Sequence, residues 1–342
     1  LTDFPVYDLK PERTNSFEVG MNMRFLKNFE LDVTYYNAKT MNQTFNPELP
    51  VGEYARIYIQ TGAVRNQGLE LALNYNNTWK DFTWNTGVTY SMNKNKILTL
   101  ADNAINPITH EKFSISSLNM GGLGSTRFIL KEGGSMGDIY SLMDLKRDAN
   151  GAVYIDENNS VVTESLEANN YIKLGSVLPK GNLAWRNNFS WKNINVAFLV
   201  SARLGGVVFS RTQAVLDNFG VSEASAAARD KGYVSVNGND RVNPEGWYSV
   251  VAGGTAVPQY YIYSATNIRL QEASIGYTIP RKWLGNVCDI KVSLIGRNLW
   301  MIYNKAPFDP ESVASTDNFY QGIDYFMMPS LRNIGFNLSI KF

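Results

Sequence analysis

The chain has 342 residues, of which 32 are Lys or Arg and 31 are Asp or Glu, so its net charge is only +1. This balance gives no basic field with which to bind nucleic acid. A single histidine, His110, and a single cysteine, Cys288, leave too few ligands for a Cys/His zinc site or a disulfide framework. We therefore expect neither a nucleic-acid-binding protein nor histidine-dependent catalysis.

Long segments in which apolar and polar residues alternate dominate the chain. The predicted strands are, in chain order, 15–26, 29–43, 66–77, 82–91, 126–131, 136–146, 183–191, 194–204, 265–279, 289–303 and 331–342. Many are about twice the common length of a strand in a soluble protein. Because successive side chains of a strand point to opposite faces, each segment has one apolar face and one polar face.

The connections between these segments alternate in length. Short turns are expected at 27–28, 78–81, 133–135, 192–193 and 280–287. Long connections are expected at 44–64, 97–125, 147–180, 205–264 and 304–330. Short turns on one side and long loops on the other are typical of outer-membrane barrels.

Two local signals add detail. The apolar phase of residues 265–279 slips between Leu270 and Ala273, which predicts a β-bulge. Trp79, Trp191 and Trp283 lie in or beside short turns, where an aromatic belt at the membrane interface is expected.

The last strand separates the two possible fold classes most clearly. One face would carry Ile334, Phe336, Leu338, Ile340 and Phe342. The other would carry Gly335, Asn337, Ser339 and Lys341. A soluble β-sandwich that binds glycans could produce this alternation, but strand length, turn pattern and the terminal Phe favour an all-β transmembrane antiparallel barrel. No apolar run is long enough for a transmembrane helix.

Several stretches of the chain carry a family resemblance. They are Leu9 to Gly20 (LKPERTNSFEVG), Leu31 to Asn37 (LDVTYYN), Arg65 to Tyr75 (RNQGLELALNY), Phe82 to Gly87 (FTWNTG), Glu132 to Tyr140 (EGGSMGDIY), Asn267 to Pro280 (NIRLQEASIGYTIP), Gly296 to Trp300 (GRNLW) and the terminal Phe342. In this order they resemble the C-terminal half of the barrel of a SusC-like TonB-dependent transporter of Bacteroidetes. The resemblance implies that residues 1–342 supply about eleven strands of a barrel of roughly 22. Its plug and N-terminal strands would lie outside this chain.

The same resemblance implies a function and partners. A transporter of this family sits in the outer membrane among its lipids, receives cargo from a SusD-like surface lipoprotein and is driven by TonB. The expected cargo is an oligosaccharide, with an oligopeptide as the alternative, and the chain itself would perform no catalysis and need no cofactor. An outer-membrane signalling receptor is a further alternative.

The loop residues 205–264 contain the candidate ligand contacts. These are Trp247, Tyr248 and Tyr260, whose rings could stack on a sugar, and Asn239, Asp240 and Arg241, which could hydrogen-bond its hydroxyls. A self-packed loop or a contact surface for a lid protein would have the same composition.

Acidic residues in the loops suggest two weaker sites. Asp148, Asn150 and Asp156 supply oxygen ligands for calcium, but Gly151 is at the wrong position for an EF-hand, and a solvated turn is the better interpretation. The pairs Asp156 with Glu157 and Asp309 with Glu311 lack the spacing of glycosidase carboxylates and are expected to be solvated loop charges. The lumen-facing charges, expected to pair with each other or with a plug, are Glu18, Arg24, Glu30, Asp32, Glu70, Arg186 and Arg203.

Overall fold

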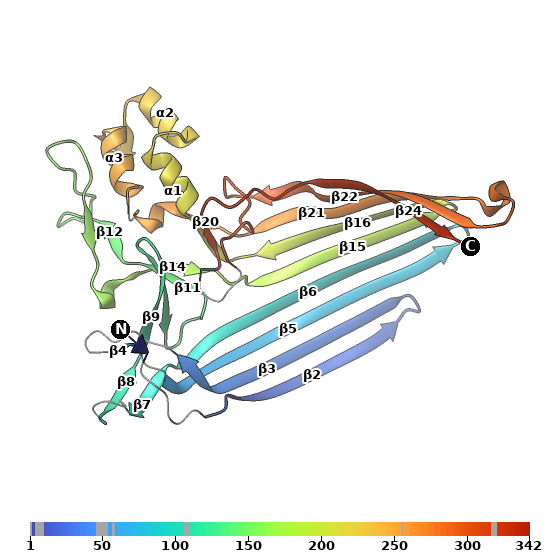
Figure 1. The fold of residues 1–342 in the computed structure, drawn as a ribbon, viewed down its shortest axis with the longest axis horizontal. Coiled ribbons are helices and arrows are strands. Elements are labelled where there is room, and N and C mark those ends of the chain that lie inside the picture. The colour runs from blue at the N-terminus through green and yellow to red at the C-terminus, as the bar shows by residue number, and fades with distance from the viewer. Residues whose placement is uncertain are drawn as a thin grey trace.

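The computed structural model describes residues 2–3, 10–45, 54–56, 59–105, 110–254, 256–315 and 320–342. Its main feature is one nine-stranded antiparallel sheet, which we call the wall sheet (Figure 1). In spatial order, which is also chain order, its strands are β2 (Arg13–Phe25), β3 (Phe29–Phe45), β5 (Ile59–Trp79), β6 (Phe82–Thr99), β15 (Gly181–Trp191), β16 (Ile194–Leu204), β21 (Asn267–Ile279), β22 (Asp289–Asn304) and β24 (Asn333–Lys341). Each strand therefore pairs with its neighbours in the wall, as in an up-and-down barrel.

All short turns lie at one end of the wall sheet, and all long connections lie at the other. Lys80 and Asp81 alone join β5 to β6, and Lys192 and Asn193 alone join β15 to β16. The opposite end carries the long segment between β6 and β15 and the segment between β16 and β21. The predicted alternation of short and long connections is thus confirmed.

The apolar face of the wall sheet is exposed. Among its exposed side chains are Phe17, Val19, Met21, Leu73, Trp185, Val196, Ile275, Val292, Leu294, Ile334, Phe336, Leu338 and Ile340. Phe336 on β24, for example, exposes 76% of its surface. Soluble monomeric proteins rarely expose a continuous apolar surface of this extent to water. A face of this size and composition matches the lipid-facing side of a membrane barrel.

The buried clusters lie at the long-connection end, and from the wall they include only the loop-side ends of β5 and β6, at Val64 and Ile97, among the clustered residues described. Small sheets are built there by β1 (Thr2–Asp3) with β4 (Tyr54–Arg56), β7 (Ala101–Ile105) with β8 (Lys112–Ile115), β9 (Ser117–Leu123) with β10 (Thr126–Lys131), β11 (Asp138–Ser141) and β14 (Ile172–Ser176), β12 (Met143–Leu145) with β13 (Thr163–Ser165), β17 (Val207–Ser210) with β20 (Ile262–Ser264) and β23 (Ile323–Asp324), and β18 (Val234–Val236) with β19 (Asp240–Val242). Phe128, Ile139, Phe209 and Ile323 from four of these strands share one buried cluster. The long connections therefore form a folded layer with a core of its own.

Three short α-helices complete this layer among the described residues: α1 (Arg211–Asn218), α2 (Glu223–Lys231) and α3 (Pro244–Val251) (Figure 1). The 3-10 turns are η1 (Ala168–Asn170), η2 (Pro258–Tyr261) and η3 (Arg281–Leu284). No helix in the described part of the chain has the length and hydrophobicity to span a bilayer.

The sequence did not predict these helices, although their boundary signals are present. Ser222 accepts a hydrogen bond from the Ser225 backbone at the start of α2, and Gly232 ends this helix in the left-handed conformation, with φ of 82°. With only eight or nine residues each, the helices carry too few turns for a clear apolar period.

The predicted strand count needs a correction. The segments 126–131 and 136–146 do form an antiparallel hairpin, β10 with β11, but it belongs to a separate four-stranded sheet. In the wall, β6 pairs directly with β15 from Asn182↔Ser91 to Trp191↔Phe82. The described residues therefore contribute nine wall strands instead of eleven, and the segment 97–125, predicted to be a long connection, contains β7, β8 and β9.

Two local predictions are confirmed. Leu199 pairs with Glu272 and Val200 with Leu270, so Gln271 is the extra residue of a bulge in β21. Trp79, Trp191 and Trp283 are all exposed at the short-turn end. Beside them the rings of Phe29, Tyr75, Trp84 and Phe189 pack in one row across four strands, with centroids 4.7, 5.2 and 6.1 Å apart.

Candidate functional site

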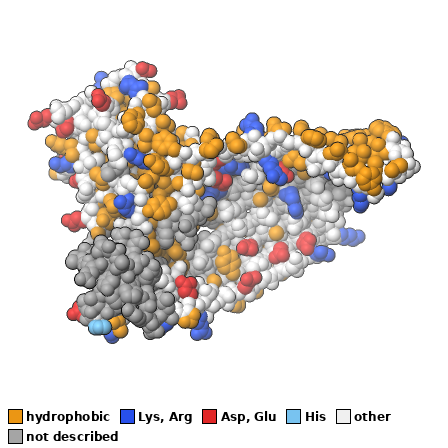
Figure 2. All heavy atoms as spheres, in the orientation of Figure 1, with side chains coloured by type: hydrophobic (Ala, Val, Ile, Leu, Met, Phe, Trp, Pro, Cys, Tyr) orange, Lys and Arg blue, Asp and Glu red, His pale blue; other side chains and the backbone are white. Residues whose placement is uncertain are grey.

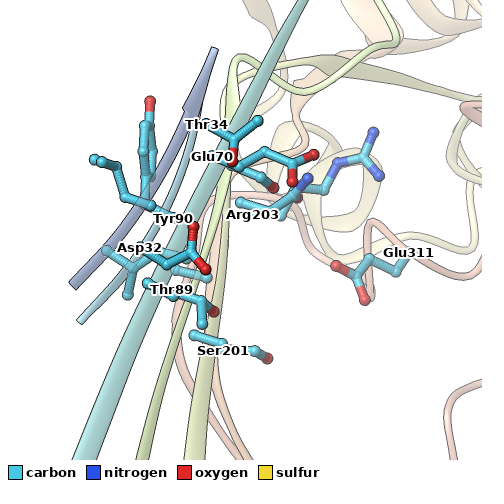
Figure 3. A pocket seen from close by; sticks show the side chains of 15 residues that line it. Asp32, Thr34, Glu70, Thr89, Tyr90, Ser201, Arg203 and Glu311 are labelled. Carbon is cyan, nitrogen blue, oxygen red and sulfur yellow. The ribbon is translucent and has the colours of Figure 1, made fainter. Parts of the chain in front are cut away.

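The polar face of the wall sheet is concave and holds a cavity of about 630 Å³. Asp32 on β3, Glu70 on β5 and Arg203 on β16 reach it from the wall, and Glu311 reaches it from the connection between β22 and β24. Figure 3 shows these side chains turned to one side of the strands, while the ring of Tyr90 on β6 points to the other side. The alternation along each strand thus places the ionisable groups in the hollow of the sheet.

The charges of this polar face are separated across the sheet. On β2, β3 and β5 it carries Glu18, Glu30, Asp32 and Glu70 with Arg24 as the counter-charge. From β15 to β24 it carries Arg186, Arg203, Arg269, Lys291, Arg297 and Lys341 with Glu272 and Asp289 as the counter-charges. In Figure 2 the lower part of the hollow carries mostly red spheres, and the upper part carries mostly blue spheres with some red beside them. One side of the lumen wall is therefore acidic and the facing side is basic.

One pair of lumen charges forms as the sequence predicted, and two lumen arginines bond to uncharged groups instead. Arg24 and Glu30 lie 3.5 Å apart. Arg186 donates to Asn74 at 3.4 Å, and Arg203 donates to the backbone oxygen of Val177 at 2.7 Å. Within the described part of the chain, Glu18 and Glu70 form no ion pair or side-chain hydrogen bond. Both carboxylates are therefore available to a partner or a ligand.

Asp309 and Glu311 are not the solvated loop charges that the sequence predicted. Arg269 on β21 lies 2.8 Å from Asp309 and 3.3 Å from Glu311, and the Arg269 and Asp309 side chains expose only 5% and 10%. Asn267 donates to Glu311 at 3.2 Å and accepts a hydrogen bond from Arg269. We call these four residues the clamp, because they hold the connection before β24 onto the lumen face of the wall.

The clamp changes the acidity of Asp309. Burial alone would raise the pKa of this carboxyl, but hydrogen bonds from the Arg269 side chain, the Ser330 side chain and the Glu311 backbone outweigh it. The pKa of Asp309 is therefore held below its ordinary value of 3.8.

The six predicted ligand contacts fall into three places. Trp247 on α3 packs edge-to-face on Tyr260, with centroids 5.2 Å apart, and also contacts the buried cluster. Tyr248 lines a groove between the helices. Asn239, Asp240 and Arg241 are exposed at the end of the β18–β19 hairpin, where Asp240 accepts a hydrogen bond from Asn237 and Arg241 lies over the Tyr233 ring. The structure thus joins the Trp247 and Tyr260 rings and separates them from the polar residues.

The groove that contains Tyr248 has a volume of about 710 Å³ and lies between α1, α2 and α3. Its buried wall includes Asp217, which accepts hydrogen bonds from Tyr261 at 3.0 Å and from Gln213 at 3.0 Å. Burial and then the Asp217 charge raise the pKa of Tyr263 to about 12 and also raise that of Tyr261. Sequence reasoning missed Asp217, because only the fold brings it to the tyrosines.

Two of the weak calcium candidates, Asp148 and Asp156, accept hydrogen bonds from backbone N–H groups of their own turns. Asp148 Oδ1 accepts from the backbone of Asn150 and Ala152, and Asp156 Oδ1 accepts from the backbone of Asn158 and Ser160. Two successive Asx turns thus explain the acidic spacing. The described residues contain no group of three or more metal-binding side chains.

The sequence and the fold of this chain both match those of known proteins. A sequence model of the family "TonB dependent receptor-like, beta-barrel" matches residues 2–198. The chain is similar to TonB-dependent receptors P3 and P26 of Formosa agariphila, with 26% and 27% identity over 100% and 97% of the chain. It spans about a third of the length of these relatives, 35% and 34%.

Solved structures give the same fold. The structure of the RagAB peptide transporter matches 97% of the chain and 35% of its own, with a TM-score of 0.70 and 16% identity. The RagAB peptide importer in the open-open state matches 98% of the chain and 35% of its own, with a TM-score of 0.71 and 17% identity. The predicted resemblance to SusC-like TonB-dependent transporters is confirmed, and the soluble β-sandwich is excluded. The chain belongs to the TonB-dependent receptor-like β-barrel family of the outer membrane.

Proposed function

We propose that residues 1–342 form the C-terminal part of the barrel of a TonB-dependent importer, which takes up a nutrient too large to diffuse through open pores. The concave, charge-separated polar face carries this proposal, because it places ionisable groups along a lumen beneath a folded layer of loops. In this scheme the chain supplies wall, lumen lining and external loops and performs no catalysis.

The edges of the wall sheet support further strands from the same transporter. Within the described residues β2 pairs only with β3, and β24 pairs only with β22. An open sheet edge is not stable in lipid, since its backbone groups have no water to bind. The proposed partners are therefore the N-terminal strands and plug of the transporter, together with TonB and a SusD-like surface lipoprotein that covers the loop end.

Two cargo classes follow from two observations. The separated acidic and basic areas of the lumen suit a cargo that carries both charges, which favours an oligopeptide. The rings of Trp247, Tyr248 and Tyr260 on the loop layer suit an oligosaccharide, with Asn239, Asp240 and Arg241 as further contacts. Because the Trp247 and Tyr260 rings already pack on each other, the structure favours the oligopeptide.

A cargo-binding experiment tests this choice. The full-length transporter with its lipoprotein partner is titrated with a zwitterionic oligopeptide mixture and with neutral oligosaccharides. We expect the Asp32→Asn/Glu70→Gln double variant to bind the peptides at least tenfold more weakly, while Glu18→Gln, outside the cavity, changes little. Tight binding of oligosaccharide that depends on Trp247 and Tyr260 would favour the sugar instead.

Transport is tested separately. In cells, uptake of the bound cargo should stop when an uncoupler collapses the proton-motive force that drives TonB. Uptake that continues without this force would contradict a TonB-dependent importer, whatever the cargo.

A further inference from the structure

A row of cations crosses the outer face of the wall sheet near its loop end. Lys39 on β3 pairs directly with Arg65 on β5, and Arg65 pairs directly with Lys96 on β6. Lys94 lies in the next row, opposite Gln67. We call Lys39, Arg65, Lys94 and Lys96 the cation row. Like charges directly opposite each other destabilise a sheet unless an anion lies between them.

Strand parity places the cation row on the lipid-facing side. Four residues further from the loop end of each strand, Tyr35 pairs with Leu69 and Leu69 with Met92, and these apolar side chains share the face of the row. Glu70, whose side chain faces the lumen, is an odd number of residues from Arg65 on β5 and therefore lies on the opposite face. The row is therefore outside the barrel and separate from the proposed cargo path.

The height of the row matches the membrane surface. On β5 the outward apolar and aromatic residues run from Trp79 at the short turn to Leu69, and a transmembrane strand needs about 9–11 residues. Arg65 precedes Leu69 by four residues and lies closer to the loop end of β5, which puts it at the level of the lipid headgroups on the loop side. β15 and β16 lack such a row, since their outward residues are uncharged up to the ends at Leu183 and Leu204.

The cation row has no carboxylate partner in the described part of the chain: none of its four members forms an ion pair there. The Nε atom of Arg65 is buried and makes no hydrogen bond within the same residues. With neighbouring strands about 4.8 Å apart, the three aligned cations span roughly 10 Å. This spacing suits a phosphorylated headgroup with several anionic oxygens.

We propose that the cation row binds the phosphate groups of an anionic lipid in the outer leaflet of the membrane. The acyl chains would lie on the apolar residues below the row, such as Leu69 and Leu71, and the phosphates would separate the opposed cations. The site anchors the β3–β5–β6 part of the wall (Figure 1) to a specific lipid. It does not depend on the identity of the cargo.

Lipid binding to the full-length receptor tests the proposal. The delipidated receptor in a non-ionic detergent is titrated with lipid A, with dephosphorylated lipid A and with inorganic phosphate, and native mass spectrometry measures the bound lipid. We expect Lys39→Gln/Arg65→Gln/Lys96→Gln to bind lipid A at least tenfold more weakly. The control Lys27→Gln/Lys80→Gln/Lys282→Gln removes the same charge from exposed lysines at the short-turn end and should change binding little.

A second readout separates lipid binding from general damage. Without lipid, the triple variant should have a Tm equal to or above that of the parent, because opposed like charges are removed. If the triple variant fails to fold, Lys96→Gln alone should still weaken lipid A binding several-fold.

Three outcomes would overturn the site. The first is equal lipid A binding by the parent and the row variants, and the second is equal binding of lipid A and dephosphorylated lipid A by the parent. The third is that inorganic phosphate saturates the site at the same concentration as lipid A does. The last outcome would assign the row to a free anion.

Discussion

Arg269 on β21 and Asp309, forty positions along the chain, form a two-pronged ion pair, with Nη2 2.8 Å from Oδ1 and Nη1 3.2 Å from Oδ2. Both side chains are almost fully buried. The pair joins a wall strand to a long connection, and it therefore couples the lumen face to the loop layer.

Removal of Arg269 should release this connection. Because Arg269→Ala leaves the Asp309 carboxylate buried without its partner, we expect a loss of about 3–5 kcal/mol in the free energy of unfolding. Hydrogen exchange should rise in residues 305–315. The control is Arg297→Ala, whose pair with Glu272 at 3.0 Å is largely exposed and should cost at most about 1 kcal/mol. Equal effects of the two variants would show that the clamp does not fix the connection.

The clamp should also depend on pH. A carboxyl whose pKa is lowered by folding contributes stability above its unfolded pKa, near the ordinary value of 3.8. This contribution is lost as the pH falls through the lower folded pKa. Thermal unfolding of the receptor between pH 7 and pH 3 should therefore show an acid loss that Asp309→Asn makes smaller. An identical acid profile in the variant would contradict this role.

The buried Tyr261 hydroxyl should support the loop layer. Tyr261→Phe leaves the Asp217 carboxylate with Gln213 as its remaining side-chain donor, so we expect a loss of about 1.5–3 kcal/mol in the free energy of unfolding. Tyr154→Phe, at an exposed tyrosine, should change little. Chemical denaturation of both variants measures the difference.

The raised pKa values of Tyr261 and Tyr263 predict alkaline behaviour as well. Folding stability from these hydroxyls is complete below pH 10, where unfolded tyrosine begins to ionise, and is lost as the pH rises toward about 12 for Tyr263. Ultraviolet absorbance of tyrosinate should show that Tyr263→Phe removes a late-titrating group. Loss of an early-titrating group instead would contradict its burial.

Adjacent residues on β24 should respond to charge in opposite ways. Leu338→Arg puts a cation on the lipid-facing side and should destabilise the barrel by about 2–4 kcal/mol near the middle of the bilayer. Asn337→Arg puts the same cation into the lumen and should cost much less. Reversible unfolding from lipid bilayers measures both, and equal costs would reject the assigned faces.

Much of the wall could be predicted because its signals are local. The alternation of residues 331–342 fixes which side chains share a face, and Lys192 with Asn193 leaves room only for a tight turn. The phase slip at Gln271 likewise reveals a bulge within one strand. These features depend on neighbouring residues alone, so the sequence by itself determined the barrel class and the end at which the loops gather.

Only the tertiary structure decided the features that depend on distant pairings. The hairpin at 126–146 alternates like a wall strand, yet the pairing of β6 with β15 excludes it from the wall. The Arg269–Asp309 pair and the aligned Lys39, Arg65 and Lys96 each need a register between separate segments. Periodicity sets the face of a side chain, but hydrogen bonding between strands sets which side chains meet.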